Sequence, residues 1–215
     1  GKKIALLDQI KAPDRQSLPE VLSREEIVRI FREVRFGRYR TPLLLCYGSG
    51  LRIGECVNLH PEDIRGKDNK IFVRCSKGGK DHYTILSSYL HKELQRYWKR
   101  HKNRCWVFPR VSRGPASVQE VCRRMGQASE PMGRTGLGNA LTHAVRAAGI
   151  LRKISCHTLR HSFASHLVDD GVPIMQIQEY LGHANIETTT AYIHLATVSH
   201  EKALDCMDSM ISKLL

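Results

Sequence analysis

Apolar residues recur at helical spacing in the first part of the chain, beginning just after Leu22. Four of them lie three or four positions apart and would share one helix face: Ile27, Ile30, Phe31 and Val34. Ser23 precedes this stripe in the position of an N-cap, and Glu26 follows three residues later in the manner of a capping box. The pattern therefore predicts a helix that starts at Ser23 and buries one face.

A second apolar segment, 43–47, runs into Gly48-Ser49-Gly50. The glycines are expected to end a helix and to allow a tight turn, because glycine adopts backbone conformations that other residues avoid. Arg52 follows directly and is expected at the edge of a buried element.

The middle of the chain changes to strand-like patterning. Segments 71–75 and 82–86 are rich in β-branched and aromatic residues, and 76–81 joins them as a glycine-containing hairpin loop. A small antiparallel sheet is expected here. Helical spacing returns over 87–102, and 106–109 closes the unit.

The stretch 110–136 has little periodicity, and we interpret it as a loop around one short helix at 118–125. The rest of the chain has helical spacing throughout. Its expected helices are 139–148, 158–168, 173–181, 186–195 and 199–214. The predicted fold class is mainly α with a small antiparallel β-sheet (α+β).

Length and charge narrow the kind of protein. A chain of 215 residues can bury one core. The net charge is +13; residues 1–110 contribute 24 − 12 = +12 and residues 111–215 contribute 10 − 9 = +1. Such an excess favours a polyanionic partner, with the phosphate contacts mainly in the basic first half. The alternative is a basic protein with no nucleic-acid role.

Several classes of protein are disfavoured. The seven cysteines have no Cys-x-x-Cys spacing, so reduced thiols in a cytoplasmic protein are expected. No apolar run reaches the length of a membrane helix, so no membrane partner is expected. Neither a P-loop nor a Gly-x-Gly-x-x-Gly fingerprint occurs, and no nucleotide cofactor is expected. His157 and His161 lie four apart, yet no Glu follows the first histidine, and a metal site is disfavoured.

A group of side chains near the end of the chain is suited to phosphodiester chemistry. His157, Arg160, His183 and Tyr192 lie within 36 residues, and the first two share a face if their segment is helical. Attack on phosphorus by a phenol needs cations that stabilise the developing charge and an acid for the leaving oxygen. The alternative for Tyr192 is a packed aromatic residue with a hydrogen-bonded hydroxyl.

Five blocks occur in a fixed order along the chain. They are Ser49-Gly50-Leu51-Arg52-Ile53-Gly54-Glu55, Ser76-Lys77-Gly78-Gly79-Lys80, His157-Thr158-Leu159-Arg160-His161-Ser162-Phe163-Ala164, Leu181-Gly182-His183 and Tyr192-Ile193-His194. Together they resemble the catalytic domain of the tyrosine recombinases, the family of phage integrases and Xer-type enzymes. The resemblance covers about residues 18–195.

The resemblance implies a catalytic set of six residues. They are Arg52, Lys77, His157, Arg160, His183 and Tyr192. Tyr192 would be the nucleophile and would form a 3′-phosphotyrosyl link. Arg52 and Arg160 would clamp the scissile phosphate, a task that suits the planar guanidinium group.

The other three residues would support that step. His157 would hydrogen-bond a non-bridging oxygen, and His183 would hold the phosphate or orient the nucleophile. Lys77 would protonate the leaving 5′-oxygen; Lys80 competes with it for this role. Neither a metal ion nor ATP would be required, because the phosphotyrosine conserves the bond energy. By spacing alone, Arg52 and Glu55 could instead form only an exposed ion pair.

The resemblance also implies a domain organisation and partners. Residues 1–19 would be an arm left from a missing N-terminal core-binding domain, 20–198 the catalytic domain, and 199–215 a C-terminal helix exchanged between protomers. Double-stranded DNA would be the substrate, recombined through a Holliday junction by a tetramer. The alternatives are a type IB topoisomerase or telomere resolvase, and a non-catalytic DNA-binding protein of the same fold.

Overall fold

The computed structural model describes residues 20–74, 80–111 and 117–182. Helices make up most of these residues. They are α1 (Arg24–Glu33), α2 (Gly37–Gly48), α3 (Ile53–Val57), α4 (Ser88–Lys99), α5 (Val118–Gln127), α6 (Arg134–Ala147), α7 (Cys156–Asp169) and α8 (Ile174–Leu181). Two 3-10 turns, η1 (Pro61–Asp63) and η2 (Gly66–Asp68), flank the first of three strands. The predicted fold class, mainly α with a small antiparallel sheet, is confirmed.

The first helix forms as the sequence predicts. The Ser23 hydroxyl accepts a hydrogen bond from the Glu26 amide at 3.2 Å, and the Glu26 carboxylate accepts one from the Ser23 amide at 2.9 Å. This capping box satisfies two of the amides that a helix start leaves unpaired. Ile27, Ile30 and Phe31 form the buried face of α1.

The sheet contains both predicted strands and one strand that was not predicted. Its order is β1 (Ile64–Arg65), β2 (Lys70–Val73) and β3 (His82–Ile85), and both pairs are antiparallel. Phe72 lies opposite Tyr83 in the register of β2 and β3. The two residues of β1 are too few to show the alternation by which a strand is recognised in sequence.

Two helices begin earlier than predicted. Helix α6 starts at Arg134 although Gly136 and Gly138 lower its helix propensity, because Leu137 is completely buried and holds the first turn in place. Helix α7 starts at Cys156, because the Ser155 side chain caps it by accepting a hydrogen bond from the Thr158 amide. His157 therefore lies in the first turn of α7.

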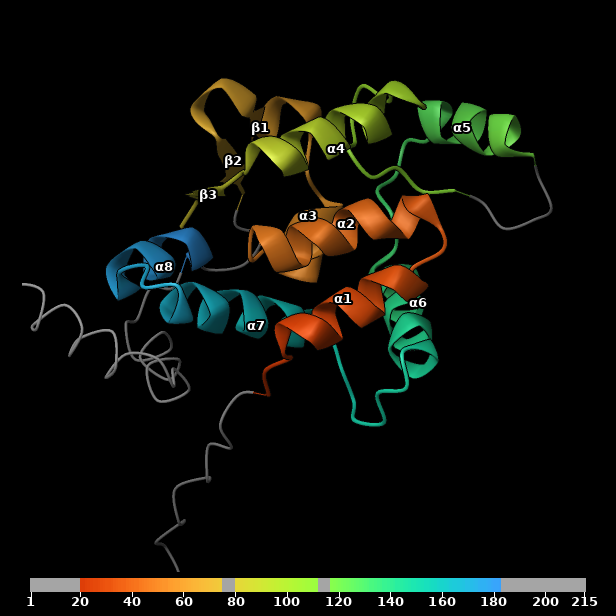
Figure 1. The fold of residues 1–215 in the computed structure, drawn as a ribbon. Helices are drawn as coiled ribbons and strands as arrows, with labels where there is room; N and C mark the ends of the chain where they lie inside the picture. Colours follow the sequence, from red (N-terminus) through yellow and green to blue (C-terminus); the bar gives the residue numbers. More distant parts are fainter. Residues whose placement is uncertain (1–19, 75–79, 112–116, 183–215) are drawn as a thin grey trace, which may run out of the picture.

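Helix α2 lies in the middle of the molecule. It packs against α7, α4, α6 and α3, while α5 lies at one end of the fold (Figure 1). A main core gathers residues from α1 to α7, and a second, smaller cluster joins α7 to α8. That second cluster consists of Phe163, Ala164, Ile177 and Leu181. The site described below lies where these two clusters meet.

Cysteines contribute to this core. Cys46, Cys56 and Cys156 are buried, whereas Cys105 is exposed. None of the five cysteines in the described ranges forms a disulfide.

Within the described ranges, none of the helices has the length and apolar character that crossing a membrane requires.

Asn103 fastens the segment after α4 to the end of α5. Its amide nitrogen donates to the carbonyls of Met125 and Ala128, each at 2.8 Å. Its amide oxygen accepts hydrogen bonds from the backbone of Cys105 at 2.9 Å and Trp106 at 2.8 Å. Asn103 is 2% exposed, so water cannot replace these bonds.

Replacing Asn103 by alanine is therefore expected to lower the free energy of unfolding by about 1–3 kcal/mol, the cost of leaving buried polar groups unpaired. Urea unfolding checks this value. Gln127→Ala, at the C-terminal end of the same helix α5, serves as the control and should change stability by less than about 0.5 kcal/mol. Equal stability of Asn103→Ala and the parent would contradict this assignment.

Two buried histidines make the stability of the fold depend on pH. Burial lowers the pKa of His101 to about 4. Its Nδ1 accepts a hydrogen bond from the backbone N–H of Asn103 at 3.1 Å. Burial also lowers the pKa of His166, which joins two elements. Its Nε2 donates to the Leu22 carbonyl at 2.9 Å, so its Nδ1 accepts from the Tyr47 hydroxyl at 2.9 Å.

The unfolded chain binds protons at these histidines more readily than the folded one, so stability falls as the pH drops below about 6.5. At about 1.4 kcal/mol for each pKa unit, His101 alone accounts for a loss of about 2 kcal/mol between pH 8 and pH 5. Urea unfolding at both pH values measures the loss. His101→Gln should reduce it, whereas His143→Gln, at an exposed position of α6, should leave it unchanged.

Candidate active site

The site is built on the turn between α2 and α3. Gly50 has a left-handed backbone with φ +65°, and a Cβ there would lie 2.7 Å from the Phe163 ring and 2.9 Å from Leu181. Only glycine fits both the conformation and the space. The turn is tied to the sheet as well, because the Thr84 hydroxyl donates to the Ser49 carbonyl at 2.7 Å. Arg52 follows as the N-cap of α3.

Arg160 points from α7 into the core beneath this turn. Its guanidinium donates to the Gly50 carbonyl at 2.7 Å and to the Leu181 carbonyl at 2.6 Å. The side chain is 4% exposed. A buried cation needs partners that replace its hydration, and these two carbonyls supply part of them. Arg160 thereby connects the α2–α3 turn, α7 and the end of α8.

Glu55 brings the two arginines together. Its Oε1 lies 2.6 Å from Nη1 of Arg52, and its Oε2 lies 3.6 Å from Nη1 of Arg160. Oε2 also accepts a hydrogen bond from the Arg52 amide at 2.8 Å. Glu55 is 7% exposed, whereas the Arg52 side chain is 40% exposed. The carboxylate thus fixes two guanidinium groups in one place, and one of them remains open to solvent.

The bridging position of Glu55 was not predicted. Its spacing from Arg52 indicates only a local ion pair, and the local ion pair is present. Arg160 lies 105 positions further along the chain than Glu55, so the shared carboxylate depends on the packing of α7 against α2.

His157 lies one turn before Arg160 on α7 and is exposed. It lines a hollow of about 700 Å³ between α6 and the start of α7, together with Ile53, Arg146 and Lys153. Its ring centroid lies 6.4 Å from that of His161. Burial and the charges of His157 and Arg160 lower the pKa of His161. In the described ranges, no three His, Cys, Asp or Glu side chains are grouped so as to hold a metal ion.

His82 is a residue near the site that was not predicted. It lies at the start of β3, and the charges of Glu55, Arg160 and Arg52 all act on its imidazole. Burial lowers its pKa below the usual range. A histidine that follows a glycine-containing loop gives no signal of this placement in the sequence.

The remaining three predicted residues, Lys77, His183 and Tyr192, lie outside the described residues. The neighbours of the first two are described. Lys77 falls in the sequence between β2 and β3, and Gly182 ends α8 with a left-handed backbone just before His183 in the sequence. Residues 199–215 and the arm 1–19 also lie outside the described ranges.

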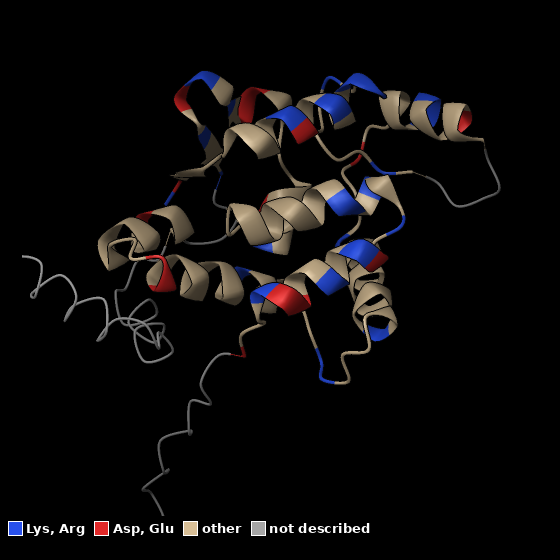
Figure 2. Ribbon diagram, viewed as in Figure 1, with Lys and Arg blue, Asp and Glu red and all other residues tan. Residues whose placement is uncertain are grey.

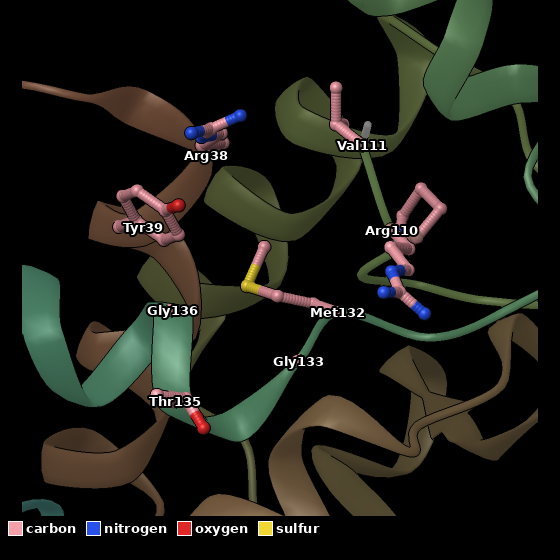
Figure 3. Close-up of a pocket in the computed structure, with 9 residues that line it drawn as sticks. Arg38, Tyr39, Arg110, Val111, Met132, Gly133, Thr135 and Gly136 are labelled. Carbon is pink, nitrogen blue, oxygen red and sulfur yellow. The ribbon is translucent and has the colours of Figure 1, made fainter. Parts of the chain in front are cut away.

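A second hollow, of about 530 Å³, lies beside the first turn of α6. Met132 forms its floor, Tyr39 and Arg38 border it from α2, and Arg110 lies on the opposite side (Figure 3). Thr135 lines both hollows. Lys and Arg are spread over α4, α5, α6 and the start of α2, whereas α8 carries none (Figure 2). Arg38 and Arg110 thus line one hollow, and Arg146, Arg152 and Lys153 line the other.

With this geometry in place, comparison with known proteins defines the class of the chain. The sequence profile of the phage integrase family matches residues 20–198, and the chain belongs to that family. The resemblance to a tyrosine recombinase catalytic domain is confirmed.

Curated proteins that are similar in sequence to the chain include tyrosine recombinases. The chain is 33% identical over 202 residues to the tyrosine recombinase XerA of Thermococcus kodakarensis, covering 93% of the chain and 66% of the relative. It is 34% identical over 197 residues to XerA of Pyrococcus horikoshii, covering 88% of the chain and 62% of that protein. The chain spans between 54% and 66% of the length of such curated relatives.

Solved structures share the fold. A crystal structure of XerA recombinase superposes with a TM-score of 0.68 at 26% identity, over 90% of this chain and 66% of that one. The site-specific recombinase XerH, bound to its palindromic difH substrate in a post-cleavage complex, superposes with a TM-score of 0.67 at 22% identity. That match covers 89% of this chain and 54% of XerH, and it shows the fold alone.

Proposed function

We propose that this chain is the catalytic part of a site-specific recombinase that cuts and rejoins double-stranded DNA. The observation that carries the proposal is the pair of guanidinium groups held on Glu55. Two carbonyls hold Arg160 in place, and the Arg52 side chain is partly exposed to solvent. An incoming phosphate can therefore contact Arg52 while Glu55 and the carbonyls that bind Arg160 stay in place. Preorganised donors of this kind stabilise the charge that develops on a phosphate during its displacement.

The reaction follows from the roles of the six residues. The phenolic oxygen of Tyr192 attacks phosphorus, and the bond between phosphorus and the 5′-oxygen breaks. Lys77 supplies the proton that this oxygen takes up, leaving a 5′-hydroxyl and a 3′-phosphotyrosyl link. Arg52, Arg160 and His157 hold the non-bridging oxygens.

His183 orients the phosphate or the nucleophile. Rejoining is the reverse reaction with a 5′-hydroxyl from a second duplex, and two such exchanges pass through a Holliday junction. All bonds that break are replaced, so the sequence of steps needs neither ATP nor a metal ion.

The DNA is expected to follow the basic hollows on either side of Thr135. His157 and Ile53 both line one of them, and Arg38 and Arg110 border the other. Lysine and arginine side chains bind phosphates and release counterions, so affinity should fall steeply with salt. We further propose that four protomers assemble on two DNA sites and that residues 199–215 pass between neighbours.

The test is covalent trapping on nicked duplexes drawn from candidate attachment sites. A nick beside the cleaved bond lets the short 5′ fragment diffuse away, so the 3′-phosphotyrosyl adduct accumulates. The parent chain, incubated in EDTA, is expected to give a denaturant-resistant protein–DNA band, and Tyr192→Phe is expected to give none, because it lacks the nucleophilic oxygen.

The products separate the alternatives. Exchange between two duplexes supports a recombinase, whereas relaxation of supercoiled DNA without exchange would indicate a type IB topoisomerase. A band from Tyr192→Phe equal to that of the parent would exclude Tyr192 as the nucleophile. If the parent bound DNA but gave no band, even with an N-terminal core-binding domain restored, the proposal would give way to a non-catalytic DNA-binding protein.

A further inference from the structure

His82 has an unusual position for a histidine. It shares a face of β3 with Thr84, because alternate residues of a strand point the same way, and this face is turned towards the helices. Thr84 is 1% exposed and bonded to the Ser49 carbonyl. Both ring nitrogens of His82 are buried, and neither has a hydrogen-bond partner in the described ranges. Buried ring nitrogens that lack hydrogen bonds cost stability, so their retention calls for a reason.

The imidazole rests directly on Gly182. A Cβ at Gly182 would lie 2.5 Å from Nδ1 and Cε1 of His82 and 2.6 Å from its Nε2. Gly182 also has φ +60°, a conformation that other residues rarely adopt. The ring therefore occupies the space that any side chain at position 182 would need. It forms a contact between β3 and the C-terminal end of α8, two elements that pack together.

This contact lies between two catalytic segments and close to the arginine pair. Lys77 precedes His82 by five positions, and His183 directly follows Gly182. Arg160 binds the carbonyl of Leu181, the residue before Gly182. A displacement of the ring would therefore shift the start of β3 relative to the end of α8.

We propose that His82 is a positioning residue for DNA cleavage: its neutral imidazole, seated on Gly182, sets the start of β3 against the turn that precedes His183. The inference rests on the proposed function. It adds a residue outside the six that act on the phosphate, and it assigns Gly182 a partner. Misplacement of reacting groups by about 1 Å can cost about 100-fold in rate, which is the size of effect such a contact can control.

The charges around His82 make this role depend on pH. Burial has the largest influence and disfavours the protonated ring, as do Arg160 on α7 and Arg52 on the α2–α3 turn. Glu55 and the Lys80 backbone act in the opposite direction. The ionisable residues of α8 are Glu179 and Tyr180, and those beside His82 in the chain are Asp81 and Tyr83.

The net effect is a lowered pKa, so the seated ring is neutral at pH 7 and above. At a pH below this lowered pKa, protonation places a third positive charge beside Arg52 and Arg160 and favours release of the ring. Cleavage is therefore expected to decline on the acid side through His82.

The experiment combines a double-mutant cycle with a pH profile of covalent attachment to a nicked duplex. His82→Ala and Gly182→Ala are each expected to slow attachment about 10–100-fold at pH 8, with DNA affinity unchanged. The double variant should recover much of the rate that Gly182→Ala loses, because its methyl group enters the space that the ring has left.

His82→Phe keeps an aromatic ring on Gly182 that cannot be protonated. It should cleave at pH 8 within about threefold of the parent and lack most of the decline at acid pH, whereas His143→Phe should keep that decline.

The thermal unfolding midpoint of each variant, measured without DNA, tests the contact independently of cleavage. If the double variant is no more stable than Gly182→Ala, or if His82→Phe keeps the acid decline of the parent, the positioning role is overturned. A parent chain that forms no adduct would instead overturn the proposed function. In that case the stability cycle still decides whether His82 is seated on Gly182.

Discussion

Replacing Arg160 by alanine is expected to lower the rate of covalent attachment to DNA by about 10²–10³-fold and to destabilise the fold. The catalytic loss follows from the removal of a cation that the proposed function assigns to the scissile phosphate. The structural loss has a separate cause. Among the described residues, the Glu55 side chain, 7% exposed, would keep Arg52 as its one ionic partner, and the carbonyls of Gly50 and Leu181 would lose the donor that Arg160 supplies. Breaking a buried pair costs about 3–5 kcal/mol.

Two further variants separate these losses. Arg160→Lys keeps the positive charge but cannot serve two carbonyls with a planar group, so it should retain part of the stability and little of the activity. Arg96→Ala removes an exposed arginine of α4 that pairs with Glu93, and it should change stability by less than about 1 kcal/mol.

Urea unfolding and single-turnover attachment measure both quantities. Attachment by Arg160→Ala at the parent rate would show that Arg160 has only a structural role.

Replacing Gly50 by alanine is expected to destabilise the fold by about 2–5 kcal/mol. A residue other than glycine pays about 1–2 kcal/mol at φ +65°. The new methyl group would also lie 2.7 Å from the Phe163 ring and 2.9 Å from Leu181, and such overpacking costs about 1–3 kcal/mol. Any relief of this collision moves the carbonyl that holds Arg160, so cleavage should fall together with stability.

Gly149 provides the matched control. It has φ +74°, yet a Cβ there would meet nothing within 4 Å. Gly149→Ala therefore reports the conformational cost alone and is expected to lose about 1–2 kcal/mol with cleavage unchanged. Chemical denaturation of both variants gives the difference. Equal losses at the two positions would mean that the turn relaxes without disturbing Phe163, and the steric part of the prediction would be wrong.

The two arginine positions show how a basic site can be both stable and reactive. A fully buried pair of cations would repel, and a fully exposed pair would be screened by water and salt. Here one guanidinium is buried against carbonyls and a carboxylate, and the other shares that carboxylate while remaining 40% exposed. The phosphate of a DNA strand would supply the negative charge that the exposed partner still lacks.

The sequence by itself determined what depends on neighbours within a few positions. The capping box of Ser23 and Glu26 predicted the start of α1, and β-branched and aromatic residues on both sides of a glycine-containing loop predicted β2 and β3. These features are readable because their hydrogen bonds and side-chain periodicity act over one turn or one strand. The ordered blocks also indicated the family, which is confirmed, and a catalytic set of six residues, which stays a prediction. For Lys77, His183 and Tyr192 the sequence remains the basis of the prediction.

Only the tertiary structure decided how these residues are held. The hydrogen bond from Arg160 to the Gly50 carbonyl spans 110 positions, and the contact of His82 with Gly182 spans 100. The early start of α6 likewise depends on the burial of Leu137 rather than on local preference. Such arrangements come from the packing of distant elements, and local sequence patterns do not encode which buried groups will meet. The sequence thus determined the chemistry available to this protein, and packing decided that Glu55 joins the arginines and that His82 lies beside them.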